Sequence, residues 1–361
     1  MSGPDWMIYG ANGYAGRVAL EHARSRGLRP VVAGRRDEAV RPLAELYGLP
    51  FRIFPLDDST ATARALDGIG TMLLAAGPFS ATSAAAIEAC LQARTNYLDI
   101  TGEAAVIEAA ASRDADAKKA GIVILPAAGF DVVPSDCLAV ALHRALPSAT
   151  RLALAIHVIA TPGPGSLKTA VEGAAAGGLI RCQGVLTPVA AALRTRRIPF
   201  SRGERWAMTI PWGDLSSAFF STGIPNIEVY LATPRPAIQI VRCSRPLMGA
   251  LRNQRLRGAL NYAIEKLAKG GTAAGRAAGR SSLWGRVEDD TGRSVEGFVE
   301  SIETTTLTAY TAVDIAARIH AGEVRPGFST PATAFEPEYI DSVPGSRMTV
   351  GPVSGAAGGG A

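Results

Sequence analysis

The amino-acid sequence predicts an α/β protein with a Rossmann-type doubly wound parallel sheet, followed by a second α+β domain with a mixed or antiparallel sheet. Up to about residue 130, short apolar runs alternate with stretches of helical periodicity, as in parallel strands joined by crossover helices. Beyond that point, strand-like runs follow one another without a helix between them, which is typical of antiparallel or mixed pairing. This change of pattern predicts two domains.

Six apolar runs are the expected strands of the first domain. They lie at Met7–Tyr9, Val31–Ala33, Phe51–Phe54, Met72–Ala76, Tyr97–Ile100 and Ile122–Leu125. Helical periodicity predicts helices over about 14–27, 37–48, 58–66, 80–94 and 103–120. Parallel strands joined by right-handed crossovers all end at one edge of the sheet, so the turns after these strands are expected to build one site.

The second domain is expected to open with a helix over about 134–145 and a strand at Arg151–Ile159. A helix over about 166–178 follows, and further strands are expected at Trp206–Ile210 and Ile227–Ala232. The turn sequence at 289–292 predicts a hairpin between Trp284–Glu288 and Val295–Ile302. A last helix, over about 304–321, is long enough to return to the first domain.

Composition excludes several classes of protein. With 361 residues, 47% of them hydrophobic and 19% charged, the chain is neither fibrous nor intrinsically disordered. Its four cysteines form no CxxC pair and no cluster with histidine, which predicts reduced thiols in a cytoplasmic protein and no metal site. The net charge of +5 does not indicate a nucleic-acid partner. No transmembrane segment is expected, because the longest uncharged run contains Gly77-Pro78 and polar cap residues.

A glycine-rich turn follows the first expected strand and precedes the first helix. It comprises Gly10, Ala11, Asn12, Gly13, Tyr14, Ala15 and Gly16 in G-x-x-G-x-x-G spacing, a variant of the dinucleotide fingerprint. Glycines let the backbone turn tightly and approach a pyrophosphate, whose charge then lies at the positive end of the helix. We expect Gly10, Asn12, Gly13 and Gly16 to cradle the phosphates, with Tyr14 and Ala15 beside them. The alternative is a turn needed only for close packing.

Two arginines, Arg35 and Arg36, end the second expected strand, where an enzyme that uses NAD usually has an acid. Guanidinium groups can bind a 2′-phosphate through paired hydrogen bonds, so the sequence favours NADP(H) over NAD(H). Solvated arginines at a helix start are the alternative. After the third strand, Asp57-Asp58 could contact adenine or cap a helix.

Further candidates follow the later strands at the same edge. Ala76, Gly77 and Pro78 are expected to form a wall beside the nicotinamide ribose. Thr101 and Glu103 follow the fifth strand, and Asp131 follows the sixth. We expect all three to present polar groups on the substrate side, and Thr101 and Glu103 also to bind the cofactor.

In these turns the sequence resembles the saccharopine dehydrogenase-like oxidoreductases, including relatives described as trans-acting enoyl reductases. The matching stretches are Gly10–Gly16, Ala33–Arg36, Ala76–Phe79, Tyr97–Glu103, Gly129–Asp136 and Gly327–Ala332. The resemblance implies hydride transfer with a nicotinamide cofactor to a C=C, C=N or C=O bond of a small-molecule or carrier-bound substrate.

With these roles, four segments are expected: an NADP-binding domain over 1–130, a substrate or dimerisation domain over 131–303, a C-terminal helix and segment over 304–340 that returns to the first domain, and a flexible tail over 341–361. A homodimer is also expected. Two alternatives stay open, a non-catalytic NADP-binding sensor or scaffold and an atypical short-chain reductase.

Reduction also needs a proton donor. The candidates are Asp131, Lys168 and Tyr97, with His157 as a further one, and each has a structural alternative as a helix cap, a surface cation or a core side chain. Tyr262 and Lys266 match the Tyr-x-x-x-Lys pattern of short-chain dehydrogenases, but they lie far beyond the nucleotide domain and are expected to be incidental.

Positive charge is concentrated in residues 235–280, with ten cations against one acid. Regularly spaced leucines make parts of this segment an amphipathic basic helix. It is either a solvated lid or a docking surface for an acidic acyl carrier, coenzyme A phosphates or a membrane surface.

Overall fold

A seven-stranded sheet with the order β15-β6-β5-β4-β1-β2-β3 organises the first half of the chain. All its neighbouring strands are parallel, and the order reverses between β1 and β4, as in a doubly wound sheet. The predicted fold class is thereby confirmed for this half. The strands are β1 (Asp5–Tyr9), β2 (Val31–Gly34), β3 (Phe51–Ile53), β4 (Ile69–Leu74), β5 (Asn96–Asp99), β6 (Val123–Leu125) and β15 (Gly327–Phe328).

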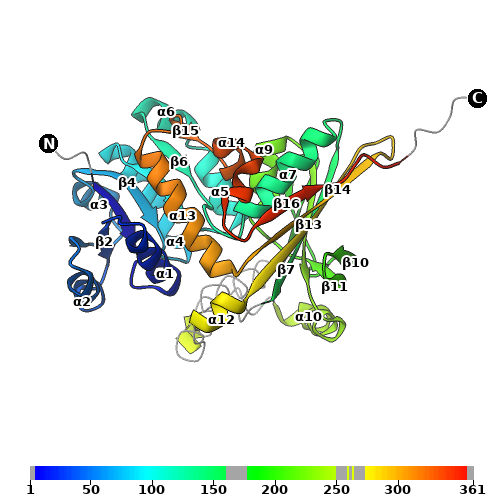
Figure 1. Cartoon of the computed structure of the whole chain (residues 1–361), viewed down its shortest axis with the longest axis horizontal. Helices are drawn as coiled ribbons and strands as arrows, with labels where there is room; N and C mark the ends of the chain where they lie inside the picture. The colour runs from blue at the N-terminus through cyan, green and yellow to red at the C-terminus, as the bar shows by residue number, and fades with distance from the viewer. Residues whose placement is uncertain (1–4, 160–176, 249–257, 260–261, 264–272, 356–361) are drawn as a thin grey trace, which may run out of the picture. The chain divides into compact units, whose positions relative to one another are not determined.

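The computed structural model describes residues 5–159, 177–248, 258–259, 262–263 and 273–355 (Figure 1). The chain forms two units, each with its own sheet. The first comprises residues 1–131 and 305–334, and the second comprises residues 132–304 and 335–361.

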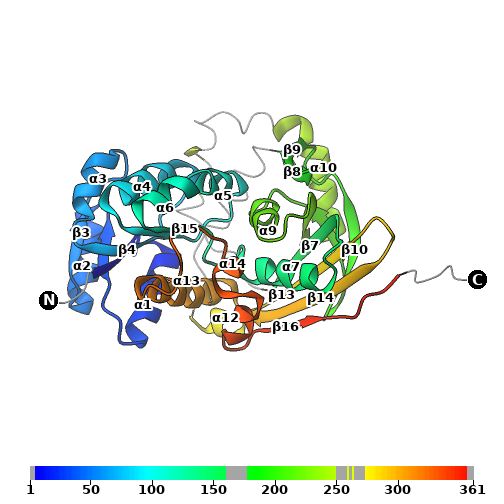
Figure 2. The ribbon, with the colours of Figure 1, turned by 90° about the horizontal axis from the view of Figure 1, so that it is seen from above.

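Helices cover both faces of the parallel sheet (Figure 2). On one face, α1 (Tyr14–Ser25) packs against α13 (Thr304–His320), where the rings of His22 and Tyr310 lie 5.2 Å apart. On the other face lie α3 (Ser59–Ala65), α4 (Phe79–Ala93), α5 (Ala104–Ala111) and α6 (Asp114–Ala120); α2 (Asp37–Tyr47) joins β2 to β3. The helix expected over 103–120 is thus two helices, because the chain leaves helical geometry at Arg113, the residue that caps α6.

A mixed sheet of nine strands organises the second unit. Its main path is β10-β11-β12-β7-β13-β14-β16, with β8 paired to β12 and β9 paired to β8. Only the β7–β12 pair is parallel among the described pairs, so this sheet is of the mixed kind expected. The strands are β7 (Arg151–Ile159), β8 (Gly178–Cys182), β9 (Val185–Val189), β10 (Thr195–Phe200), β11 (Gly203–Thr209), β12 (Asn226–Ala232), β13 (Arg280–Glu288), β14 (Ser294–Ile302) and β16 (Arg347–Val350).

Two glycines allow a helix to approach this sheet closely. Gly285 and Gly297 face each other across β13 and β14. A Cβ atom at Gly285 would lie 2.7 Å from Leu142 Cδ1, and one at Gly297 would lie 3.0 Å from Leu138 Cδ1. Both leucines belong to α7 (Val133–Ala145), which packs on these strands. The remaining described helices are α9 (Asp214–Thr222), α10 (Arg235–Met248), α12 (Ala273–Ala278), α14 (Pro331–Phe335) and the 3-10 helix η2 (Pro337–Ser342).

The flexible tail predicted over 341–361 is wrong for its described part. Residues 347–350 form β16, which pairs with β14, and Ser354 exchanges backbone hydrogen bonds of 2.7 and 2.8 Å with Ser294. The segment 335–340, expected to return to the first domain, belongs to the second unit instead. The strand satisfies backbone groups of β14 that would otherwise form an open sheet edge.

Candidate functional site

The glycine-rich turn joins β1 to α1, and steric contacts require two of its glycines. Gly10 has φ of +87°, and a Cβ atom there would lie 2.9 Å from atoms of Ala75 and Ala76, in the turn after β4. A Cβ atom at Gly16 would collide with the carbonyl oxygen of Gly10. The backbone N–H of Gly10 donates to Ala33 at 2.8 Å, which ties the turn to β2. Only glycine therefore allows the close approach of these segments.

The start of α1 is suited to an anion. Its N-cap residue, Gly13, offers no side-chain acceptor, and the first helical turn contains no acid. In contrast, Asp58 caps α3 by accepting the N–H groups of Thr60 at 2.9 Å and Ala61 at 3.2 Å. The hypothesis that Asp57-Asp58 supplies a helix cap is confirmed for Asp58. An exogenous phosphate can supply at α1 the negative charge that a carboxylate supplies at α3.

The three other residues predicted to hold the phosphates also lie at this turn. Tyr14 and Ala15 are partly exposed in the first turn of α1. Asn12 is exposed. Its Oδ1 lies close to Gly34, since a Cβ atom added at Gly34 would be 3.2 Å from this oxygen. Asn12 therefore reaches from the turn toward the end of β2, where Arg35 follows.

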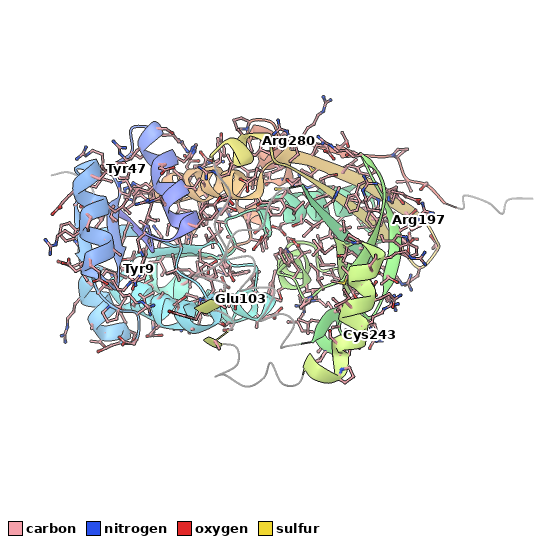
Figure 3. All side chains as sticks on the ribbon, turned by 90° about the horizontal axis from the view of Figure 1, so that it is seen from below. Tyr9, Tyr47, Glu103, Arg197, Cys243 and Arg280 are labelled. Carbon is pink, nitrogen blue, oxygen red and sulfur yellow. The ribbon has the colours of Figure 1, made fainter. Side chains whose placement is uncertain are left out.

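Arg35 and Arg36 are exposed after β2. Arg36 lies 3.8 Å from Glu38, and both side chains are mostly exposed, so this ion pair is weak. Tyr9, labelled in Figure 3, ends β1 and donates its hydroxyl hydrogen to the carbonyl of Phe54 at 2.8 Å. Burial raises the pKa of Tyr9 to about 12, a rise that the nearby Arg35 opposes and Asp57 increases. Because Ala33 of β2 is in register with Tyr9 of β1, Arg35 follows at the carboxyl edge of the sheet, beside the end of β1.

The turn after β4 is held by an acid from the turn after β5. Gly77 and Pro78, joined by a cis peptide bond, are exposed immediately before α4. The carboxylate of Glu103 (Figure 3) accepts the N–H groups of Phe79 at 2.9 Å and Ser80 at 3.0 Å. Ala76, next to Gly77, is partly exposed. The structure therefore gives Glu103 a helix-capping role, while its predicted contact with the cofactor stays a prediction.

A buried network explains Tyr97 and Thr101 differently from the sequence. Tyr97 is fully buried, and its hydroxyl donates to Asp99 Oδ2 at 2.6 Å. Burial and this carboxylate raise the pKa of Tyr97 well above its ordinary value. Tyr97 is therefore a core residue and not an accessible proton donor. Thr101 is also fully buried, and its Oγ1 accepts the N–H of Glu103 at 3.1 Å.

Asp99 is the residue of this network that sequence reasoning did not select. Its Oδ1 accepts the N–H groups of Thr101 at 2.9 Å and Ala127 at 2.8 Å, so one buried carboxylate joins the turns after β5 and β6. Burial raises the pKa of Asp99 to about 6. An acid at the end of an otherwise apolar strand is the signal that could have identified it.

Asp131 lies beyond these bonds, in the turn after β6. Its carboxylate packs directly on Gly102, where a Cβ atom would be 2.5 Å from Asp131 Oδ2. The same turn is held by α13, since Thr308 Oγ1 accepts the N–H of Phe130 at 3.0 Å and Thr311 donates to Ala128 at 2.8 Å. The side chain is partly exposed, and desolvation raises the pKa of Asp131 to about 7. A carboxyl group with this pKa is half protonated near neutral pH, as a general acid requires.

The other candidate donors lie elsewhere. Lys168 and Lys266 lie outside the described residues. His157, in β7 of the second unit, has its ring 5.3 Å from that of Phe200, and burial lowers its pKa. Tyr262 is 62% exposed in the second unit.

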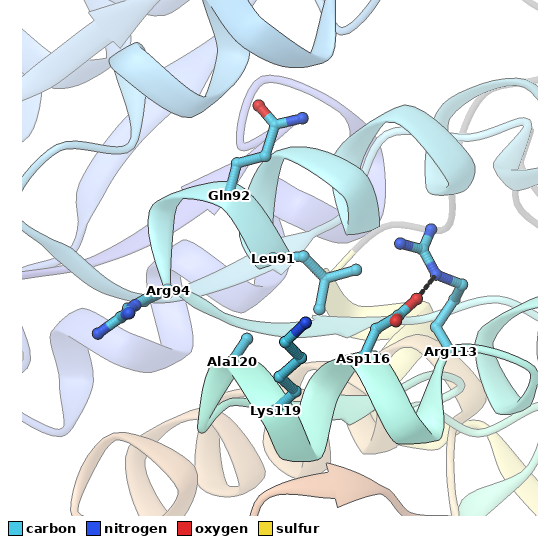
Figure 4. A pocket seen from close by; sticks show the side chains of 7 residues that line it. All are labelled: Leu91, Gln92, Arg94, Arg113, Asp116, Lys119 and Ala120. Carbon is cyan, nitrogen blue, oxygen red and sulfur yellow. Dashed lines mark hydrogen bonds and ion pairs between the residues drawn. The ribbon is translucent and has the colours of Figure 1, made fainter.

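An open concavity of about 430 Å³ in the first unit is not part of this site (Figure 4). It lies between the end of α4 and α6, at the edge of the sheet away from the glycine-rich turn. Its Arg113 is paired with Asp116 at 2.7 Å and with Glu88 at 2.8 Å. The lining residues are Leu91, Gln92, Arg94, Arg113, Asp116, Lys119 and Ala120.

Comparison with known proteins agrees with the fold and with this turn. Residues 6–125, which include the glycine-rich turn and both arginines, match the family model for the saccharopine dehydrogenase NADP binding domain. This match covers 120 residues, about a third of the chain. The cofactor is accordingly NADP(H), as the arginines after β2 predict.

Curated proteins that are similar to part of this chain are named trans-acting enoyl reductases. The Mycobacterium leprae protein is 34% identical over 150 residues, which are 39% of this chain and 35% of that protein. The Mycobacterium tuberculosis (strain ATCC 25618 / H37Rv) protein is 32% identical over 150 residues, with the same coverage. The match thus spans about a third of the length of these relatives.

The fold extends to the second unit. Apo saccharopine dehydrogenase (L-Glu forming) from Saccharomyces cerevisiae superimposes with a TM-score of 0.65 at 11% sequence identity, covering 98% of this chain and 100% of that one. Both the parallel sheet and the mixed sheet therefore belong to one known architecture.

Proposed function

We propose that this protein is an NADPH-dependent reductase that reduces the C=C bond of an enoyl thioester carried on an acyl carrier protein or on coenzyme A. The observation that carries the proposal is the partly exposed carboxyl group of Asp131, which packs on Gly102 at the carboxyl edge of the sheet that also holds the glycine-rich turn of the NADP binding match. Burial, which raises the pKa of Asp131 to about 7, agrees with a role in proton transfer. The names of the curated relatives support the C=C bond and the carrier-bound substrate. Reduction of C=N or C=O bonds is the alternative chemistry for the same site.

The residues that would hold the cofactor follow from the turns. The start of α1, with Gly10 and Gly16 allowing close approach, fits the pyrophosphate. Arg35 and Arg36 are exposed where a 2′-phosphate would lie, and the wall at Gly77-Pro78 fits the nicotinamide ribose. Bound NADPH would supply a hydride to the substrate.

The protein's own contribution to chemistry is the proton. When the β-carbon of an enoyl thioester receives a hydride, the α-carbon must receive a proton, and the products are the saturated thioester and NADP⁺. We assign this proton to the Asp131 carboxyl group, which would then regain a proton from water. Its position on Gly102 and the bonds from α13 to the same turn hold it at the sheet edge.

The test follows the absorbance of NADPH during incubation with four substrates. These are the crotonyl thioester of N-acetylcysteamine, a crotonyl acyl carrier protein, a cyclic imine and an oxo acid. We expect oxidation of NADPH with the thioesters and none with the other two. Turnover of the imine alone would show that the reduced bond is C=N, and turnover of the oxo acid alone would show that it is C=O. Tight binding of NADPH without any turnover would favour the non-catalytic sensor or scaffold.

We also propose that the protein is a cytoplasmic homodimer. None of the described helices is long and apolar enough to span a bilayer. A cytoplasmic homodimer stays a prediction, which sedimentation of the purified protein and fractionation of cells would test.

A further inference from the structure

The second unit has an arginine-rich surface that extends beyond the basic segment seen in the sequence. The β10–β11 hairpin carries five arginines within twelve residues, and it lies beside α10 (Figure 1). We call the following eight residues the arginine surface: Arg194, Arg196, Arg197, Arg202, Arg205, Arg235, Arg242 and Arg245. With Glu204 and Glu228, their only acidic partners among the described residues, the net charge is +6, which exceeds the +5 of the whole chain.

Direct contacts join α10 to the hairpin. Arg245 donates to the carbonyls of Ala191 at 2.8 Å and Ala192 at 3.0 Å, just before β10. Arg242 donates to the Thr195 hydroxyl at 3.3 Å, and Arg235 lies 4.5 Å from the ring centre of Trp206 in β11. The two segments, which are about 40 residues apart in the sequence, therefore meet at β10, an edge strand of the mixed sheet. Because side chains alternate between the faces of a strand, Arg197 lies on the face toward α10, whereas Arg196 and Arg205 lie on the opposite face. The arginine surface thus comprises both faces of this sheet edge.

Most of these charges are not neutralised within the described chain. Arg194 pairs with Glu228 at 2.7 Å and Arg197 pairs with Glu204 at 2.5 Å. Arg196 instead lies 4.9 Å from the ring centre of Trp284, which orders the guanidinium but leaves its charge. The other five have no carboxylate within 4.0 Å among the described residues: Arg202, Arg205, Arg235, Arg242 and Arg245. Like charges held together disfavour the compact state, so an acidic partner would be attracted strongly.

The chemistry of the surface favours an acidic protein. Every cation in it is an arginine, whose planar guanidinium binds carboxylates through paired hydrogen bonds. Membrane attachment needs an exposed apolar face, but over residues 235–246, the part of α10 whose side chains are described, Ile238 is buried and Ile240 is the only exposed large apolar side chain. Single-stranded nucleic acids need exposed aromatic rings, but Trp284 is fully buried and Arg235 covers a face of Trp206.

We infer that the arginine surface docks the acidic acyl carrier protein that presents the thioester substrate. This inference rests on the proposed function, because the carrier is the macromolecule that the reaction would require. Charged groups at the rim of such an interface mainly accelerate association, and their effect decreases with salt.

The test compares two double charge reversals. The test variant combines Arg202→Glu and Arg205→Glu, two exposed residues of the arginine surface. The control variant combines Arg325→Glu and Arg347→Glu, two exposed residues outside that surface, and changes the net charge by the same amount. The first variant should lower kcat/KM for crotonyl acyl carrier protein at least about tenfold and leave the N-acetylcysteamine thioester unaffected. The control variant should match the wild type with both substrates. Equal behaviour of the two variants, or an equal loss with both substrates, would overturn the inference.

Direct binding separates this inference from the proposed reaction. A fluorescently labelled acidic acyl carrier protein, titrated at low and high salt, should bind the wild type and the control variant but not the Arg202→Glu/Arg205→Glu variant. This result would support the surface even if neither thioester were reduced, an outcome that refutes only the proposed reaction. A different result would overturn the inference: the carrier does not bind, whereas anionic vesicles or a DNA oligonucleotide bind the wild type but not the Arg202→Glu/Arg205→Glu variant.

Discussion

Replacing Asp131 by Asn should remove a specific pH dependence of stability. Burial raises the pKa of Asp131 from 3.8 to about 7. Between these two values, the folded chain keeps the proton while the unfolded chain releases it. The stabilisation due to the protonated form is therefore complete below about pH 4 and is lost as the pH rises to about 7. The side-chain amide of the Asp131→Asn variant cannot titrate, so the variant lacks this loss.

The magnitude follows from the width of that window. Each unit of pH between the two pKa values costs about 1.4 kcal/mol, so the wild type should lose about 3 kcal/mol more than Asp131→Asn between pH 5 and pH 8. Urea denaturation of both proteins at the two pH values measures this difference, and the subtraction removes the contributions of other groups. The same variant should lose most reductase activity while gaining relative stability at pH 8. Parallel pH dependences of the two unfolding free energies would refute the reasoning.

Two further substitutions test the cofactor site, and a third tests the cap of α4. Arg35→Ala should weaken NADPH binding about tenfold or more while leaving NADH unchanged, because a charged hydrogen bond to the 2′-phosphate contributes about 1.5–3 kcal/mol; calorimetric titration measures both affinities, and equal losses would contradict the assignment. Gly16→Ala should abolish binding of both dinucleotides, since its methyl group would collide with the Gly10 carbonyl; unchanged affinity would show that the turn does not hold the phosphates. Glu103→Gln should lower stability by about 1 kcal/mol, since a neutral amide caps α4 less well than a carboxylate; thermal unfolding measures the loss, and an unchanged midpoint would argue against the cap.

Much of the first unit could be predicted because its signals are local. The alternation of apolar and helical segments indicated the parallel sheet, and the spacing of Gly10, Gly13 and Gly16 indicated the phosphate turn. At a tight turn the backbone conformation is limited by the residue type itself: Gly10 has a positive φ, which glycine adopts without steric cost. Arg35 and Arg36 pointed to NADP(H) for another reason: in a doubly wound sheet, the residues at the end of the second strand lie next to the ribose of a bound dinucleotide.

The tertiary structure alone decided what the other site residues do. The sequence places Tyr97 in one strand and Thr101 and Glu103 directly after it. It does not tell that Tyr97 is buried against Asp99 or that Glu103 caps α4, 24 residues away in the chain. The edge strand β16 and the arginine surface were likewise visible only in the tertiary structure. Pairing of β16 with β14, and of α10 with the hairpin, depends on contacts between distant segments, which leave no periodic pattern in either segment alone. Local geometry thus specified the glycine-rich turn, whereas long-range packing determined which polar groups remain exposed at the edge of the parallel sheet and on the second unit.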